Sequence, residues 1–162
     1  MNRYLLDSNY WINAGHHYPR DIFPSFWEEM ESLVKSGGVV VHQTVLDELN
    51  RKDDEASAWM RSIGGYQVMP ISEETFKKYL ECCRWAEDPS RGYERGAIDE
   101  FEESGRADAW ICAEACASGL TIVTDEKPSN SAKKIKIPDV CAAFGVSCIS
   151  NFAFMRNEGF SF

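Results

Sequence analysis

The sequence has no long hydrophobic run. None of its apolar stretches approaches the roughly 20 residues that a membrane-spanning helix needs. Met1-Asn2-Arg3 leads straight into a short apolar run, without the longer apolar region that a signal peptide would show. We therefore expect a cytoplasmic protein with no membrane partner.

The six cysteines lack the paired spacing of common metal and redox motifs. No Cys-x-x-Cys pair is present, and the nearest zinc-like spacing joins Cys112 to Cys116, one turn apart within a predicted helix. We expect reduced cysteines that serve as small core residues in a cytosolic protein, with a zinc site as the alternative.

Positive charge is scarce, with 17 Lys and Arg against 26 Asp and Glu and a formal net charge of −9. This balance argues against a nucleic-acid binder, because affinity for phosphates rests on Lys and Arg. Two features weaken that argument. Bound metal would neutralise several acids, and four lysines gather in the stretch 127–136. An acidic surface also suits a basic protein partner.

Short apolar runs alternate with segments of helical spacing along the 162 residues. The content of 44% hydrophobic and 12% aromatic residues, without repeat or linker, predicts one globular domain over residues 1–162. The alternation favours an α/β three-layer sandwich around a central, mostly parallel sheet. We expect a loop with His16 and His17 after the first strand, and a short Phe-rich tail. Expected strands are 4–6, 39–41, 66–69, 120–124 and 146–149; expected helices lie around 23–34, 45–49, 56–63, 72–85, 107–118 and 138–144.

Four acidic positions stand far apart in the sequence but at places that this fold brings together. Asp7 and the pair Asp125-Glu126 each follow a predicted strand, Asp108 opens a predicted helix, and Glu48 lies in a short helix. The carboxyl ends of parallel strands and the adjoining helix termini line one crevice. Clustered carboxylates repel one another, so the arrangement is tenable mainly around a divalent cation. The pattern predicts metal-assisted phosphodiester chemistry.

Three of the four positions also have a structural explanation. Asp7 could cap the turn that follows it, Asp108 would complement a helix dipole, and Glu48 alone would be a solvated helix residue. Ser8 and Asn9 are candidates to contact the metal waters or the substrate, and both also suit a turn. Thr124 is a further hydroxyl donor, and Lys127, Lys133 and Lys134 are candidates to contact RNA beside the acids.

The motifs occur in the order RYLLDSNYW, VLDEL, ADAWICAEA and GLTIVTDE, which resembles the order in PIN-domain nucleases, including VapC-type toxins. With FPSFWEEM, the Trp59 helix and KIPDVCAAFGVSCI, the fuller pattern resembles an uncharacterised PIN-like family, DUF4411, over nearly the whole chain. By position, Asp7, Glu48 and Asp108 match the three principal metal-binding acids of PIN domains. Their fourth acid matches Glu126, and this sequence departs from the pattern by having Glu at that position and an acid at both 125 and 126.

The resemblance implies a Mg²⁺- or Mn²⁺-dependent endoribonuclease in which a metal-activated water attacks the RNA phosphate. It further implies the toxin of a toxin–antitoxin pair, an antitoxin that inserts a segment into the acidic crevice, and a homodimer. Which of Asp125 and Glu126 completes the ligand set, and whether one or two ions bind, are open at this point.

Two other functions fit the residues less well. A catalytically weak PIN-scaffold module that binds protein or RNA would not need clustered repulsive charge. A phosphatase with Asp7 as nucleophile usually has a second Asp two residues on, where this sequence has Asn9.

Overall fold

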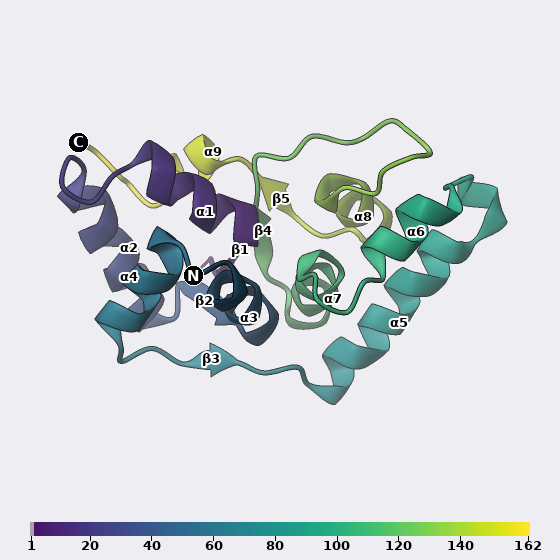
Figure 1. Ribbon diagram of the computed structural model, residues 1–162, viewed down its shortest axis with the longest axis horizontal. Coiled ribbons are helices and arrows are strands. Elements are labelled where there is room, and N and C mark those ends of the chain that lie inside the picture. The colour runs from purple at the N-terminus through teal and green to yellow at the C-terminus, as the bar shows by residue number, and fades with distance from the viewer. Residues whose placement is uncertain (1) are drawn as a thin grey trace.

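A five-stranded, all-parallel sheet forms the centre of the computed structural model, which describes residues 2–162. Helices flank the sheet, so the predicted three-layer α/β sandwich is confirmed (Figure 1). The strands, in the spatial order β3-β2-β1-β4-β5, are β1 (Tyr4–Leu6), β2 (Val39–His42), β3 (Val68–Met69), β4 (Thr121–Val123) and β5 (Cys148–Ile149).

The central strands are buried along their whole length. All residues of β1 and β2 are buried, and so are Ile122 and Val123 of β4. Apolar side chains on both faces are typical of parallel strands covered by helices on each side. Three strands are shorter than predicted. The predicted ranges were 66–69 for β3, 120–124 for β4 and 146–149 for β5, but the flanking residues leave the sheet to enter loops.

Four helices follow β1 and β2 in the first half of the chain. They are α1 (Ser8–His17), α2 (Pro24–Ser36), α3 (Gln43–Lys52) and α4 (Glu55–Ile63). The prediction that His16 and His17 lie in a loop was wrong. They form the end of α1, which begins directly after β1. The Asp7 side chain accepts a hydrogen bond from the Tyr10 backbone N–H and caps α1, and Trp11 and Ala14 bury its inner face.

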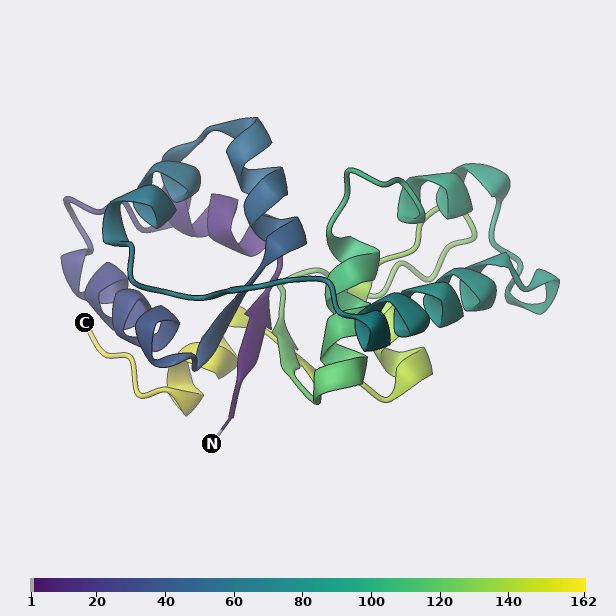
Figure 2. The same ribbon diagram turned by 90° about the horizontal axis from the view of Figure 1, so that it is seen from below.

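The helices of the second half up to Phe144 lie on the other side of β1 and β4, whereas the last helix lies on the side of α1 and α2 (Figure 2). Gly37 ends α2 and Gly119 ends α7 (Asp108–Ser118), as predicted, and both glycines adopt the left-handed conformation, with φ of 83° and 69°. The helical elements of the second half are α5 (Glu73–Glu87), the 3₁₀ turn η1 (Pro89–Arg91), α6 (Arg95–Phe101), α7 (Asp108–Ser118), α8 (Ile137–Phe144) and α9 (Asn151–Asn157).

The Phe-rich end of the chain is helical rather than irregular. Ser150 accepts a hydrogen bond from the Ala153 backbone N–H and caps α9, while Phe154 and Met155 pack into the core. This helix was missed because its two turns are too short to show a clear apolar period. Its first residue, Asn151, proves to be part of a cavity wall.

The cysteines behave as small core residues. None of the six forms a disulfide, and Cys82, Cys112 and Cys141 are buried. Within residues 2–162, no helix is both long and apolar enough to cross a membrane.

The order of the strands creates a single reversal point in the sheet. From the central β1 the chain builds outward through β2 to β3, then returns to add β4 and β5 on the opposite side of β1. In such doubly wound sheets, ligands bind where the strand order reverses, beyond the carboxyl ends of the strands. Here that place lies beyond Leu6 of β1 and Val123 of β4.

Candidate active site

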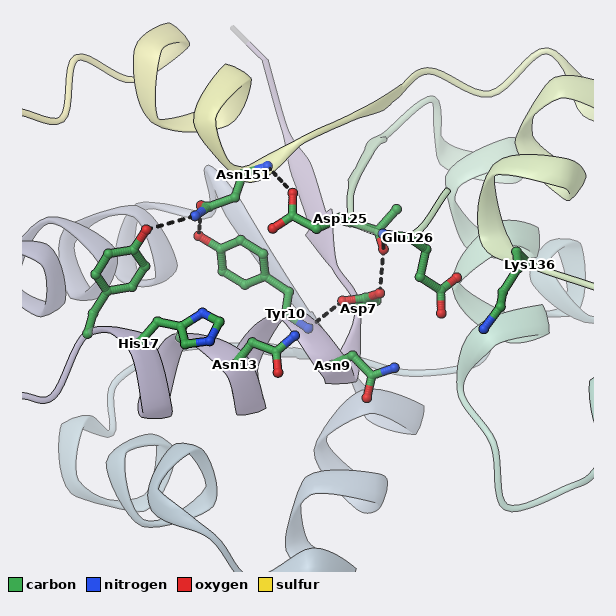
Figure 3. A pocket seen from close by; sticks show the side chains of 12 residues that line it. Asp7, Asn9, Tyr10, Asn13, His17, Asp125, Glu126, Lys136 and Asn151 are labelled. Carbon is green, nitrogen blue, oxygen red and sulfur yellow. Dashed lines mark hydrogen bonds between the residues drawn. The ribbon is translucent and has the colours of Figure 1, made fainter. Parts of the chain in front are cut away.

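A cavity of about 300 Å³ opens at this reversal point (Figure 3). Asp7 and two acids of the loop after β4 form one part of its wall, mostly neutral polar side chains of α1 and α9 form another, and the charged Lys136 completes it. The lining residues are Asp7, Asn9, Tyr10, Asn13, Ala14, His17, Tyr18, Thr124, Asp125, Glu126, Lys136 and Asn151.

Asp7 is nearly inaccessible, with 2% of its surface exposed. Its Oδ1 accepts a hydrogen bond of 2.5 Å from the Tyr10 N–H, and its Oδ2 accepts one of 2.6 Å from the Thr124 hydroxyl. Burial, with a smaller contribution from the negative charges of Glu126 and Asp108, raises the pKa of Asp7 to about 7 against the opposing effect of both hydrogen bonds. Asp7 is therefore both a helix cap and a buried acid with a raised pKa at the cavity.

The two consecutive acids after β4 point to different neighbours. Glu126 is half-buried, and its carboxylate accepts a hydrogen bond of 3.1 Å from the Ile137 N–H. Burial raises the pKa of Glu126, and the charge of Asp108 adds to this effect. Asp125 is exposed and accepts a hydrogen bond of 2.9 Å from the Asn151 N–H at the start of α9. Glu126 thus joins the group of mutually repelling acids, whereas Asp125 holds α9.

Asp108 and Glu48 come from the first turn of α7 and from α3. The Asp108 carboxylate lies 3.0 Å from the guanidinium of Arg106, and Glu48 accepts a hydrogen bond of 2.9 Å from the Ala107 N–H. Burial raises the pKa of Asp108; the Arg106 charge opposes this, and the Glu48 charge adds to it. A Lys52 ammonium lies 3.5 Å from the other Glu48 oxygen.

A second cavity of about 440 Å³ adjoins the first. Glu48 and Asp108 line it, and Asn9 lines both cavities, so the two share a border. The second cavity is also the more basic of the two, because Arg51, Lys52 and Arg106 form part of its wall; Glu103 and Gly105 complete it.

The donor set is suited to a hard divalent cation, although the side chains are not in coordinating positions. Within residues 2–162, no three His, Cys, Asp or Glu side chains are close enough together to hold a metal ion as they stand. Each acid is instead hydrogen-bonded or paired within the protein. Their oxygen chemistry fits Mg²⁺ or Mn²⁺. The charges of Asp108 and Glu126 raise the pKa of Asp7, and the charge of Asp108 raises the pKa of Glu126. Arg106 contacts one of the two Asp108 oxygens, so it would compete with a cation for that oxygen.

The predicted substrate-contacting residues have varied surroundings. Ser8 is buried, and its hydroxyl has no hydrogen-bond partner in the described chain. Asn9 is exposed at the border of the cavities, and Thr124 donates its hydroxyl hydrogen to Asp7. Lys127 and Lys133 are exposed and do not line either cavity, and Lys134 pairs with Glu100 at 2.9 Å. Substrate contact by these residues stays a prediction.

Arg106 was missed at the site, and Lys136 was predicted only as part of the lysine-rich stretch 127–136. Lys136 lines the first cavity, its side chain points toward Glu126 (Figure 3), and its charge lowers the pKa of Glu126 and Asp108. Arg106 lies directly against Asp108. Both stand next to a helix start, Lys136 before α8 and Arg106 just before α7, and this position could have singled them out.

The fold and the two cavities define a doubly wound α/β protein with an acidic site at the reversal point of its sheet. The family model described as "Domain of unknown function (DUF4411)" matches residues 4–162, and the chain belongs to this family. A comparison with curated proteins finds no match. The likeness to PIN-domain nucleases stays a prediction.

Proposed function

We propose that this chain is a Mg²⁺- or Mn²⁺-dependent endoribonuclease with a PIN-like site. The observation that carries the proposal is the environment of Asp7. This acid is 2% exposed at a cavity on the sheet's reversal point, its pKa is raised to about 7, and two further carboxylates act on it. A buried group of like charges is costly unless a cation offsets it.

The acids Asp7, Glu48, Asp108 and Glu126 would hold the cation, with Asp125 at the edge of the site. When bound, such an ion acidifies a coordinated water and offsets the charge that develops on the scissile phosphate. Thr124 holds the Asp7 carboxylate in one orientation through its 2.6 Å hydrogen bond. This hydrogen bond restricts the orientation of the Asp7 carboxylate at the cavity.

Positive charge for RNA comes from the rim of the two cavities. Lys136 would contact a phosphate oxygen beside Glu126, and Arg51 and Lys52 would contact flanking phosphates from the second cavity. Lys127, Lys133 and Lys134, in the loop between β4 and α8, would contact a longer strand farther away.

The cellular role that fits this activity is the toxin of a toxin–antitoxin pair in the cytoplasm, acting as a homodimer. The net charge of −9 and the acidic cavity favour an antitoxin with a basic segment that enters the cavity and competes with metal and RNA. Expression of the wild type should arrest growth, whereas expression of Asp7→Asn should not.

The activity is tested by cleavage of mixed tRNA and mRNA with Mg²⁺, Mn²⁺ or EDTA. We expect metal-dependent cutting that Asp7→Asn removes. The matched control is Asp21→Asn, because Asp21 is exposed and lines neither cavity. Equal cutting by the wild type and Asp7→Asn, or cutting that persists in EDTA, would contradict the proposal.

A catalytically weak binding module is the second candidate. It is favoured by the engagement of Asp108 with Arg106 and of Glu48 with the Ala107 N–H, which gives both acids structural partners. A folded protein that binds RNA with any metal but never cuts it would support this alternative.

A further inference from the structure

One face of α1 presents a row of unengaged polar side chains to the first cavity. Asn9, Asn13 and His17 are spaced four residues apart, which places them on the same side of the helix, and all three line the cavity (Figure 3). Each is exposed, and among the lining residues drawn in Figure 3 none of the three side chains is hydrogen-bonded to another. Their donors and acceptors are therefore available to a ligand.

The facing wall is held rigidly by Asn151 at the start of α9. Its Oδ1 accepts a hydrogen bond of 2.6 Å from the Tyr10 hydroxyl, and its Nδ2 donates one of 3.2 Å to the Tyr18 hydroxyl. The Asn151 backbone N–H donates to Asp125. Tyr10 is itself buried, so this network links α1 to α9 with a fixed amide orientation.

The distribution of charge decides which part of a nucleotide this region accepts. The acids of the cavity lie at Asp7 and on the loop after β4, and the nearby positive charges lie at Lys136 and in the second cavity. The wall formed by α1 and α9 is otherwise neutral, rich in amides and hydroxyls. Neutral amide groups can pair with the edges of bases, whereas most of the attraction for phosphates comes from Lys and Arg.

We propose that the part of the cavity between α1 and α9 is a subsite for one unpaired nucleobase of RNA, next to the phosphate handled at Asp7. This proposal rests on the proposed nuclease function. A volume of about 300 Å³ is at the lower end of small-molecule sites, which suits a single base. The amides of Asn9 and Asn13 contact the base edge, and the His17 imidazole contacts its face or edge.

The subsite defines the class of substrate as single-stranded RNA. A base in a duplex has its pairing edge occupied and its faces stacked, so it cannot enter a cavity of this size. Loops, bulges and unpaired ends supply bases that can enter it.

The experiment measures binding rather than cutting. Fluorescein-labelled tetramers of U, C, A and G, and a tetramer of abasic ribose phosphates, are titrated by anisotropy against protein carrying Asp7→Asn, which prevents turnover. We expect at least one base to bind more tightly than the abasic strand. Adding Asn13→Ala with His17→Ala should weaken that binding about tenfold and leave the abasic strand unaffected. His16→Ala is the matched control, since His16 is an exposed neighbour that does not line the cavity.

Other outcomes overturn the subsite. These are equal binding of all strands including the abasic one, no binding of any strand, or an unchanged preference in the double variant. The result is separable from the nuclease itself. Base-selective binding that depends on Asn13 and His17 would support the subsite even if wild-type protein never cut RNA. Metal-dependent cutting with no such dependence would retain the nuclease and reject the subsite.

Discussion

Thr124 donates its hydroxyl hydrogen to Asp7 over 2.6 Å and so links the ends of β1 and β4. The same hydroxyl oxygen accepts a hydrogen bond of 3.1 Å from the Glu126 N–H. One side chain therefore orients Asp7 and also fixes the backbone from which Glu126 projects. Because the two strands flank the reversal point of the sheet, this contact sets the geometry of the cavity between them.

Replacing Thr124 with Val should impair RNA cleavage and move its acidic limb to higher pH. The Thr124 hydrogen bond lowers the pKa of Asp7, so its loss raises that pKa above about 7 and less of the acid is ionised at neutral pH. The measurement is the pH profile of kcat/KM. Thr124→Ser retains the hydroxyl and should restore the wild-type profile; an unshifted profile in the Val variant would count against this role.

Asp7→Asn should stabilise the metal-free protein at pH 8. Burial raises the pKa of Asp7 from 3.8, its value in the unfolded chain, to about 7 in the folded protein. The free energy of unfolding is therefore highest below pH 3.8, and it falls as the pH rises through about 7. The loss is on the order of 4 kcal/mol at pH 8. Asn does not titrate, so the gain in Tm should be several degrees at pH 8 and shrink at pH 5.

The matched control for this stability measurement is the exposed Asp21→Asn, which should leave Tm unchanged at both pH values. Added Mn²⁺ should raise the Tm of the wild type and of Asp21→Asn, but not of Asp7→Asn. A variant Asp7→Asn that is less stable than the wild type at pH 8 would show that Asp7 acts chiefly as a helix cap.

Arg106→Gln should tighten Mn²⁺ binding and weaken RNA binding. The Arg106 guanidinium lies 3.0 Å from Asp108 and also pairs with Glu100, so it competes with a cation for Asp108. It also supplies positive charge to the second cavity, which the variant removes. Calorimetric titration of Mn²⁺ and anisotropy with labelled RNA measure the two effects. Arg84→Gln, an exposed position, is the control; weaker Mn²⁺ binding in Arg106→Gln would contradict the competition.

Glu114→Ala should destabilise the fold by about 3–5 kcal/mol, because it leaves a buried network without its acceptor. Glu114 is 2% exposed and accepts hydrogen bonds from Thr75 at 2.9 Å and Ser118 at 2.5 Å, with His42 at 3.1 Å. The network joins β2 to α5 and α7. Urea unfolding measures the effect, with the exposed Glu29→Ala as the control. A change below about 1 kcal/mol would show that the network adds little.

The Glu114 network makes the stability of the fold depend on pH in the opposite direction to Asp7. Burial opposes the charged form of Glu114, but the hydrogen bonds from His42, Ser118 and Thr75 outweigh it and hold the pKa below its ordinary value of 4.5. Stability from Glu114 is therefore present above that value and lost as pH falls through the lowered pKa. The Glu114→Ala variant should lose this part of the acid sensitivity.

The sequence predicted the strands and most helices, because buried apolar runs and apolar residues at helical spacing are local features. It also placed Asp7, Asp108 and Glu126 near one point, because the carboxyl ends of parallel strands share an edge. It did not predict α1, because Asp-Ser-Asn suits a turn as well as a helix cap. The side chains of Asp125 and Glu126 point in different directions because they accept hydrogen bonds from the backbone N–H groups of Asn151 and Ile137. No local sequence pattern links these distant residues to the two acids.

The most direct test of the central claim is a calorimetric titration of Mn²⁺ into the metal-free wild type at pH 8, alongside Asp7→Asn and Asp21→Asn. If the acids at the reversal point form a cation site, the wild type and Asp21→Asn bind Mn²⁺ saturably and Asp7→Asn does not. A folded wild type without saturable Mn²⁺ binding, or saturable binding unchanged by Asp7→Asn, would contradict the account.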